Sequence, residues 1–125
     1  MDVNILAILA AAVVNIIVGT VWYSHAIFGN AYANLTGKKR EGYYIASLLA
    51  AAASATVLAL LVEATGSNSI ESGALLGLLG CIGFIATSNA VNFLFEKRPL
   101  KLYLITAGHH LIAYMFMGAI LGGLA

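Results

Sequence analysis

Four apolar segments, each long enough to cross a lipid bilayer, constrain this chain more than any other feature. They span residues 3–23, 43–62, 72–95 and 100–124. A spanning helix needs about 20 mostly apolar residues, and within lipid every backbone polar group must find its partner inside the segment. The sequence lacks the many short alternating strands of a membrane barrel. We therefore predict an all-α integral membrane four-helix bundle, built from two antiparallel hairpins in a single domain, residues 1–125.

The composition excludes the common soluble classes. Hydrophobic residues make up 62% of the 125 residues and charged residues only 9%. A soluble domain carries about a quarter charged residues. The net charge is +1, and the basic residues flank apolar runs without forming a solvated stripe, so we expect no nucleic-acid partner. The expected surroundings are the lipid bilayer.

The basic residues predict the orientation of the chain in the membrane. All six lie in the two loops at residues 24–42 and 96–101, which a four-span chain places on one side: Lys38, Lys39, Arg40, Lys97, Arg98 and Lys101. Loops rich in Lys and Arg stay in the cytoplasm. We expect a multi-pass protein of the cell membrane with these loops in the cytoplasm and both termini outside.

The segment from Ser24 to Thr36 is longer than a simple turn requires. Phe28, Tyr32 and Leu35 recur in it at helical spacing, between polar asparagines. Such an amphipathic pattern is typical of a helix that lies in the membrane interface. We predict a short interfacial helix after the first span.

Glycines predict where the spans pack closely. Two pairs stand at four-residue spacing, Gly73 with Gly77 and Gly118 with Gly122. In lipid, helices associate where small residues let two backbones approach. We assign these four glycines to helix packing. The same pattern fits a homodimer, and we expect a homo-oligomer.

Polar residues from three spans reach a similar depth. Asn89 and His109 lie ten residues before and after Pro99, or roughly 15 Å from the turn, and Asn15 lies at nearly the same level. By helical angle, His110 shares a face with Tyr114 and is expected inside the bundle. His109 points about 100° away, toward a second helix contact or a subunit interface.

Two interpretations of these polar residues stay open. In the first, the polar residues form a pocket within the membrane that binds or transports a small solute or a proton. The residues that line this pocket are Asn15, Asn89, Asn92, His110 and Tyr114. In the second, the cluster only fixes helix register, and the protein is a non-catalytic scaffold or accessory subunit. The identity of any small-molecule ligand is not encoded in a recognisable motif.

Catalytic and cofactor signatures are missing from the sequence. Adjacent histidines diverge on a helix, no His-x-x-x-His pair occurs, and the single Cys81 excludes a cysteine cluster. There is no nucleophile elbow and no phosphate loop. We expect no metal, no cofactor and no catalytic residue, and an enzyme is the least favoured class.

Three motifs carry a resemblance to a known family. They are "GTVWYSHAIFG" at the end of the first span, "NAVNFLFEKRPLKLYLI" across the second hairpin and "MGAILGG" near the end of the chain. Together they resemble a family of small prokaryotic four-span proteins known as domain of unknown function 1761, over nearly the whole chain. The resemblance implies four helices and a bacterial or archaeal membrane. It implies no activity and no functional residues.

Overall fold

The structure is a computed structural model that describes residues 4–24, 26–37 and 44–125, and this described part is all helical. In chain order the elements are α1 (Ile5–Trp22), α2 (Gly29–Thr36), α3 (Tyr44–Thr65), α4 (Ile70–Gly80), the π-helical segment η1 (Cys81–Ala86), α5 (Thr87–Glu96) and α6 (Leu100–Gly123). Because α4, η1 and α5 follow without a break, they form one long helix. The all-α fold with four long apolar helices and a short helix after the first is confirmed.

The observed helix ends follow local capping. Asn4 begins α1, because its side-chain oxygen accepts hydrogen bonds from the amides of Leu6 and Ala7. Ser69 begins α4 two residues earlier than predicted, through a reciprocal capping box with Ser72. The predicted starts at residues 3 and 43, His25 and the first basic cluster at residues 38–40 lie outside the described residues.

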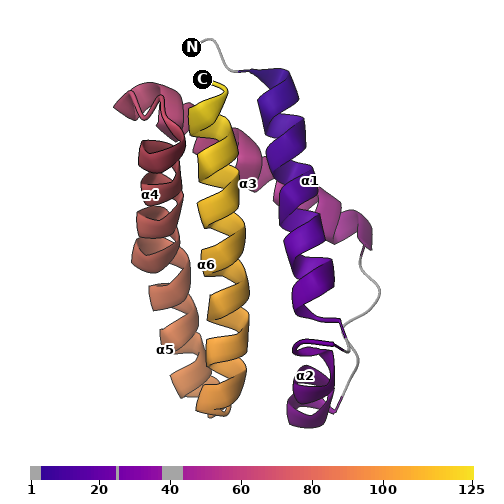
Figure 1. Ribbon diagram of the computed structural model, residues 1–125. Coiled ribbons are helices and arrows are strands. Elements are labelled where there is room, and N and C mark those ends of the chain that lie inside the picture. The colour runs from indigo at the N-terminus through magenta and orange to yellow at the C-terminus, as the bar shows by residue number, and fades with distance from the viewer. Residues whose placement is uncertain (1–3, 25, 38–43) are drawn as a thin grey trace.

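Helix α6 lies at the centre of the arrangement. Figure 1 shows α4 and α5 along one side of α6 and α1 along the other, while α3 crosses behind at a steep tilt. The start of α1 and the end of α6 lie at one end of the bundle. At the other end lie α2 and the turn between α5 and α6. Asn89 on α5 and Asn15 on α1 are therefore on opposite sides of α6.

Glycines bring α4 and α6 into backbone contact. A Cβ added to Gly73 would meet the carbonyl oxygen of Gly118, and one added to Gly77 would meet that of Tyr114. Gly122 in turn faces Gly73 and the Ser69 carbonyl. Only glycine allows such an approach, so all four glycines assigned to packing are used within one chain.

Small residues also form the contact between α1, α3 and α6. Its buried members are Ala7, Ala11, Ala12, Ala51, Ala55, Leu58, Ala59, Val62, Met117 and Leu121. Alanines supply most of the α1 and α3 side of this cluster, and they allow the two helices to approach α6 closely. Met117, which is fully buried, fills the remaining space from α6.

The third predicted span contains an irregularity that the sequence did not indicate. Cys81–Ala86 form a π-helical segment, whose wider turn disturbs the usual ladder of backbone bonds. Two hydroxyls donate to carbonyls of this segment: Thr87 Oγ1 to Gly83 at 2.8 Å and Tyr103 Oη to Ala86 at 2.8 Å. Such side-chain bonds let lipid-embedded helices tolerate irregular backbone.

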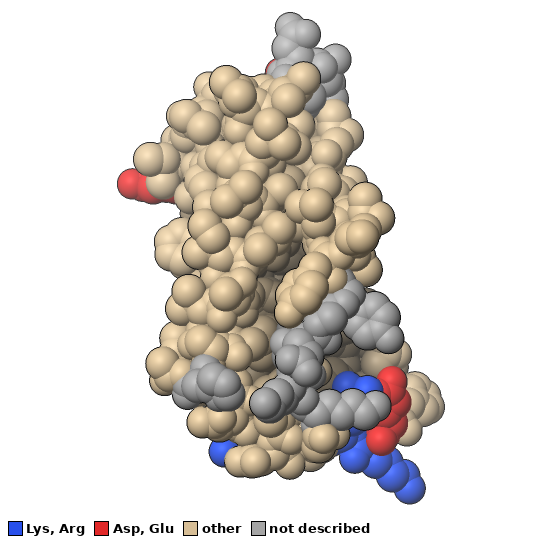
Figure 2. All heavy atoms as spheres, turned by 90° about the vertical axis from the view of Figure 1, so that its right-hand side faces the viewer, with Lys and Arg blue, Asp and Glu red and all other residues tan. Residues whose placement is uncertain are grey.

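The surface matches a protein that spans a bilayer. Large apolar side chains are exposed along all four long helices. On the face drawn in Figure 2, Lys and Arg gather at the lower end of the molecule. The described basic residues are Lys97, Arg98 and Lys101, and Arg98 pairs with Glu96 at 2.7 Å. The chain is a multi-pass membrane protein.

Candidate functional site

A polar groove lies between α1, α3 and α6. We call it the Asn15–His109 groove, and its volume is about 340 Å³. It is lined by Asn15, Ile16, Gly19, Thr20, Tyr23, Tyr44, Ser47 and His109. Most of these side chains carry a hydrogen-bonding group, although the helices that supply them are apolar enough to span a membrane.

One face of α1 supplies the groove's long wall. Asn15, Gly19 and Tyr23 follow at steps of four residues, which places them above one another on a helix. Thr20 lies beside them and donates its hydroxyl to the Ile16 carbonyl at 2.9 Å. Asn15 is seven residues from the end of α1, so the wall extends roughly 10 Å along the helix.

His109 forms the inner side of the groove and packs against α1. Its side chain is buried, with 6% of its surface exposed. A Cβ on Gly19 would lie only 3.1 Å from His109 Nε2, so the glycine makes the room in which the imidazole lies. The ring of Tyr23 meets that of His109 edge-on, with centroids 5.3 Å apart. The groove therefore depends on a glycine facing a histidine.

A second glycine, Gly108 on α6, lies in the same contact between α1 and α6. Trp22 Nε1 donates to the Ile105 carbonyl of α6 at 2.9 Å. Its ring lies over Gly108, where an added Cβ would come within 2.8 Å of Trp22 Cζ2. Each helix thus offers a glycine to a large side chain of the other, and we call this pairing the Gly19–Gly108 interlock. It sets the rotation of α6 that turns His109 toward α1.

The chemistry of the lining suits a neutral polar molecule. An asparagine amide both donates and accepts, and so do hydroxyls and a neutral imidazole. None of the described lining residues is Asp, Glu, Lys or Arg. Within residues 4–24, 26–37 and 44–125, no three His, Cys, Asp or Glu side chains lie where they could hold one metal ion.

The structure separates the residues that depth alone had grouped. Asn15 lines the groove, whereas Asn89 is half-buried on α5 and Asn92 is exposed there. His110 is half-buried, and its ring lies 4.9 Å from that of His109 and 6.4 Å from that of Tyr114. Of the two histidines, His109 is the more buried and the one in the groove. A binding role for the four predicted residues outside the groove stays a prediction.

Tyr114 takes part in a different contact. Its hydroxyl donates to Ser54 Oγ on α3 at 2.9 Å. This bond joins α3 to α6 on the side of the bundle that faces α4. Tyr114 therefore serves helix packing and borders a second groove, which is distinct from the first.

Sequence reasoning missed His109, Thr20 and Ser47 as members of one site. The stripe of Asn15, Gly19 and Tyr23 was a usable signal, because polar and small residues at steps of four mark a helix face. Ser47 had no comparable signal, since its position depends on how α3 crosses α1.

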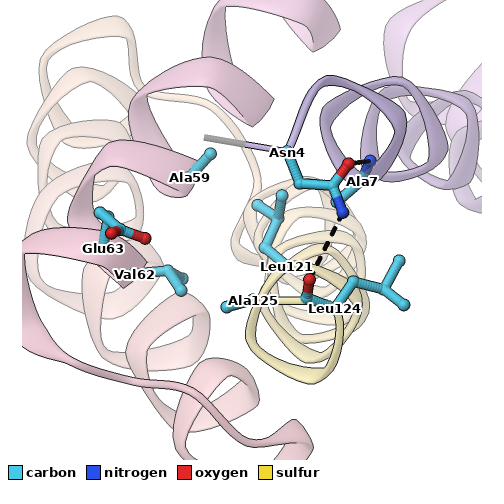
Figure 3. A pocket seen from close by; sticks show the side chains of 8 residues that line it. All are labelled: Asn4, Ala7, Ala59, Val62, Glu63, Leu121, Leu124 and Ala125. Carbon is cyan, nitrogen blue, oxygen red and sulfur yellow. Dashed lines mark hydrogen bonds between the residues drawn. The ribbon is translucent and has the colours of Figure 1, made fainter. Parts of the chain in front are cut away.

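A smaller hollow of about 90 Å³ lies at the terminal end of the bundle. Figure 3 shows Asn4 reaching from α1 to α6, where its Nδ2 donates to the Leu124 carbonyl at 3.4 Å. Ala59, Val62 and Glu63 face this contact from α3. Asn4 thus caps α1 and holds the end of α6, which closes the bundle at this end.

The fold and groove define the class: a small multi-pass helical membrane protein with a polar groove between its spans. The chain belongs to the family described as Protein of unknown function (DUF1761), whose sequence model matches residues 6–122. The family resemblance seen in the sequence is thereby confirmed. No curated protein and no solved structure matches the chain.

Proposed function

We propose that this protein binds a small, neutral polar solute within the membrane, in the Asn15–His109 groove. The observation that supports this most strongly is the setting of His109, a buried imidazole beside a hollow that Asn15 and Ser47 also line. Polar side chains at membrane depth are costly, and they typically mark substrate or ion pathways. The groove gathers such side chains from three helices around one hollow.

The size of the groove limits what it can hold. A volume of about 340 Å³ corresponds to roughly ten water molecules at about 30 Å³ each. This suits a small metabolite with its hydration, or a file of water that could carry a proton, and it is too small for a lipid. Binding is the primary role in this proposal, and transport of the solute or a proton is its extension.

The proposed orientation places the end of the groove that Tyr23 and Tyr44 line toward the cytoplasm. Tyr23 and Tyr44 lie at the ends of α1 and α3, on the side of the chain where the predicted cytoplasmic loops lie. Lys97, Arg98 and Lys101 follow the positive-inside rule if that side is cytoplasmic. Both termini would then lie outside the cell. Homo-oligomer formation stays a prediction, to be checked by native mass spectrometry.

Thiol labelling tests whether the groove is wet. In a Cys81→Ala background, Ser47→Cys places a thiol on the groove, and Leu48→Cys places one at nearly the same depth on an exposed apolar face of α3. The thiolate is the reactive form, and a thiol in lipid stays protonated. A water-soluble methanethiosulfonate reagent should therefore label Ser47→Cys much faster than Leu48→Cys.

The rate comparison separates the two classes of function. Faster labelling at residue 47 supports a water-accessible binding groove. Equal, slow labelling at both positions would mean that the polar side chains are packed and dry, which contradicts the proposal and favours the scaffold role.

A further inference from the structure

A second, larger groove lies along α3 on the side that faces α4, whereas the Asn15–His109 groove lies on the side that faces α1. It has a volume of about 590 Å³ and lies between α3 and the helix formed by α4 and η1. Its walls are apolar, and its rim carries exposed side chains such as Val57, Leu79 and Phe84. No described residue in its lining is charged. We call it the Ser54 groove, after the serine in its floor.

Glycines that pack against nothing create this space. On the same helix, Gly73 and Gly77 meet the backbone of α6, but a Cβ on Gly80 or Gly83 would meet no atom within 4 Å. Gly80 and Gly83 both line the groove. The first two glycines therefore serve packing within the chain, while the next two leave a hollow.

Ser54 differs from the helical threonines in its hydrogen bonding. Five described threonines donate their hydroxyl to the carbonyl four residues earlier, the usual way to satisfy this group in a helix: Thr20, Thr36, Thr56, Thr65 and Thr87. Within the described residues, the only hydrogen bond of Ser54 is the one that its oxygen accepts from Tyr114. The Ser54 hydroxyl proton is thus available to a ligand in the groove.

The depth of Ser54 restricts the ligand. Ser54 lies ten residues from the start of α3 and eleven from its end, so about 15 Å of helix separates it from either end. The hydrocarbon core is about 30 Å thick, which places Ser54 near the midplane. The ester carbonyls of a phospholipid stay near the headgroups and do not reach this depth. A ligand for Ser54 must carry its acceptor oxygen into the core.

From these observations we infer that the Ser54 groove binds a neutral, lipid-soluble carbonyl compound: an apolar chain without a charged headgroup, whose carbonyl oxygen accepts the Ser54 hydroxyl. The apolar walls bind the chain, and the described lining offers no charged partner to an ionic head at this depth. The hydrogen bond from the hydroxyl fixes how deep along the groove the ligand lies. This site is separate from the Asn15–His109 groove, and either can fail without the other.

A matched pair of probes tests the site on the full chain in detergent. Hexadecan-2-one carries the chain and the carbonyl, and hexadecane carries the chain alone, so both partition into micelles similarly. Titration of each probe is followed by the apparent Tm, which a ligand of the folded state raises. We expect hexadecan-2-one to raise the Tm at lower concentration than hexadecane does.

Two variants assign the effect to this groove. Ser54→Ala should weaken the apparent affinity for the ketone about fivefold, the size of one neutral hydrogen bond, and leave hexadecane unchanged. Gly80→Leu should abolish the response to both probes by filling the groove. Leucine is a better helix former than glycine and has open space at this position, so the variant is expected to fold.

Three results would overturn the inference. Equal responses of the wild type to both probes would show that an alkyl chain alone suffices and that the carbonyl contributes nothing. An unchanged response in Gly80→Leu would place the probe elsewhere. A dimer seen by native mass spectrometry in the wild type and lost in Gly80→Leu would assign the groove to a second copy of the chain.

Discussion

Replacing Gly108 with alanine tests the Gly19–Gly108 interlock, which holds α1 against α6. The new methyl group would lie 2.8 Å from Trp22 Cζ2. Trp22 must then move, and its bond to the Ile105 carbonyl is broken or lengthened. We expect Gly108→Ala to destabilise the bundle although alanine favours helix.

The expected magnitude follows from three opposing contributions. Overpacking of a filled contact costs about 1–3 kcal/mol. The lost hydrogen bond between helices in lipid adds about 0.6 kcal/mol. The higher helix propensity of alanine stabilises the helix by up to about 1 kcal/mol relative to glycine. The net destabilisation is roughly 1–2 kcal/mol. Gly80→Ala is the matched control, because its Cβ meets open space and only the favourable helix contribution remains.

Trp22 also supplies the assay, because it is the only tryptophan of the chain. Its emission can be followed while SDS replaces a mild detergent, and the free energies of unfolding of the two variants are compared. We expect the free energy of unfolding of Gly108→Ala to lie about 2–3 kcal/mol below that of Gly80→Ala, because the control keeps only the favourable helix contribution. Equal stability of the two variants would refute the close packing of Trp22 on Gly108.

Three further variants test the rest of the bundle. Gly77→Ala should lower the free energy of unfolding by at least about 1–3 kcal/mol, because its Cβ would meet backbone and no flexible side chain; stability equal to that of Gly80→Ala would contradict this. Asn4→Ala should cost about 1 kcal/mol through the lost helix cap, with faster amide exchange in the first turn of α1; unchanged exchange would argue against the cap. Tyr103→Phe removes the donor to the Ala86 carbonyl, so amide exchange should rise in η1 and not in α1; a uniform change would indicate only a global loss of stability.

The sequence predicts the spans because their cause is local. Four apolar runs of sufficient length leave few alternatives to four helices, and capping by Asn4 and Ser69 shifts their ends by only a few residues. The close contact of α4 with α6 could also be anticipated, because glycines at four-residue spacing occur in both helices. The π-helical turn had no sequence signal, since Cys81–Ala86 read as ordinary apolar helix.

The site was harder to predict because it depends on which helices are neighbours. Depth can be counted along the chain from Pro99, and it placed Asn15 and Asn89 at one level. Which helices lie next to one another cannot be counted along the chain. The structure puts α6 between these two residues. The rotation of α6 follows from how Trp22 packs on Gly108, a contact between residues far apart in sequence. The exposure of His109 and His110 follows from that rotation.

Native mass spectrometry of the protein purified in mild detergent tests most directly whether the Asn15–His109 groove holds a small polar molecule. Wild type should retain an added mass of small-metabolite size. His109→Phe keeps a ring of similar shape without the polar atoms and should lose that mass. Tyr114→Phe changes a polar residue outside the groove and should retain it. The proposed function would be contradicted if all three proteins showed only the mass of the polypeptide. It would also be contradicted if His109→Phe retained the added mass in full.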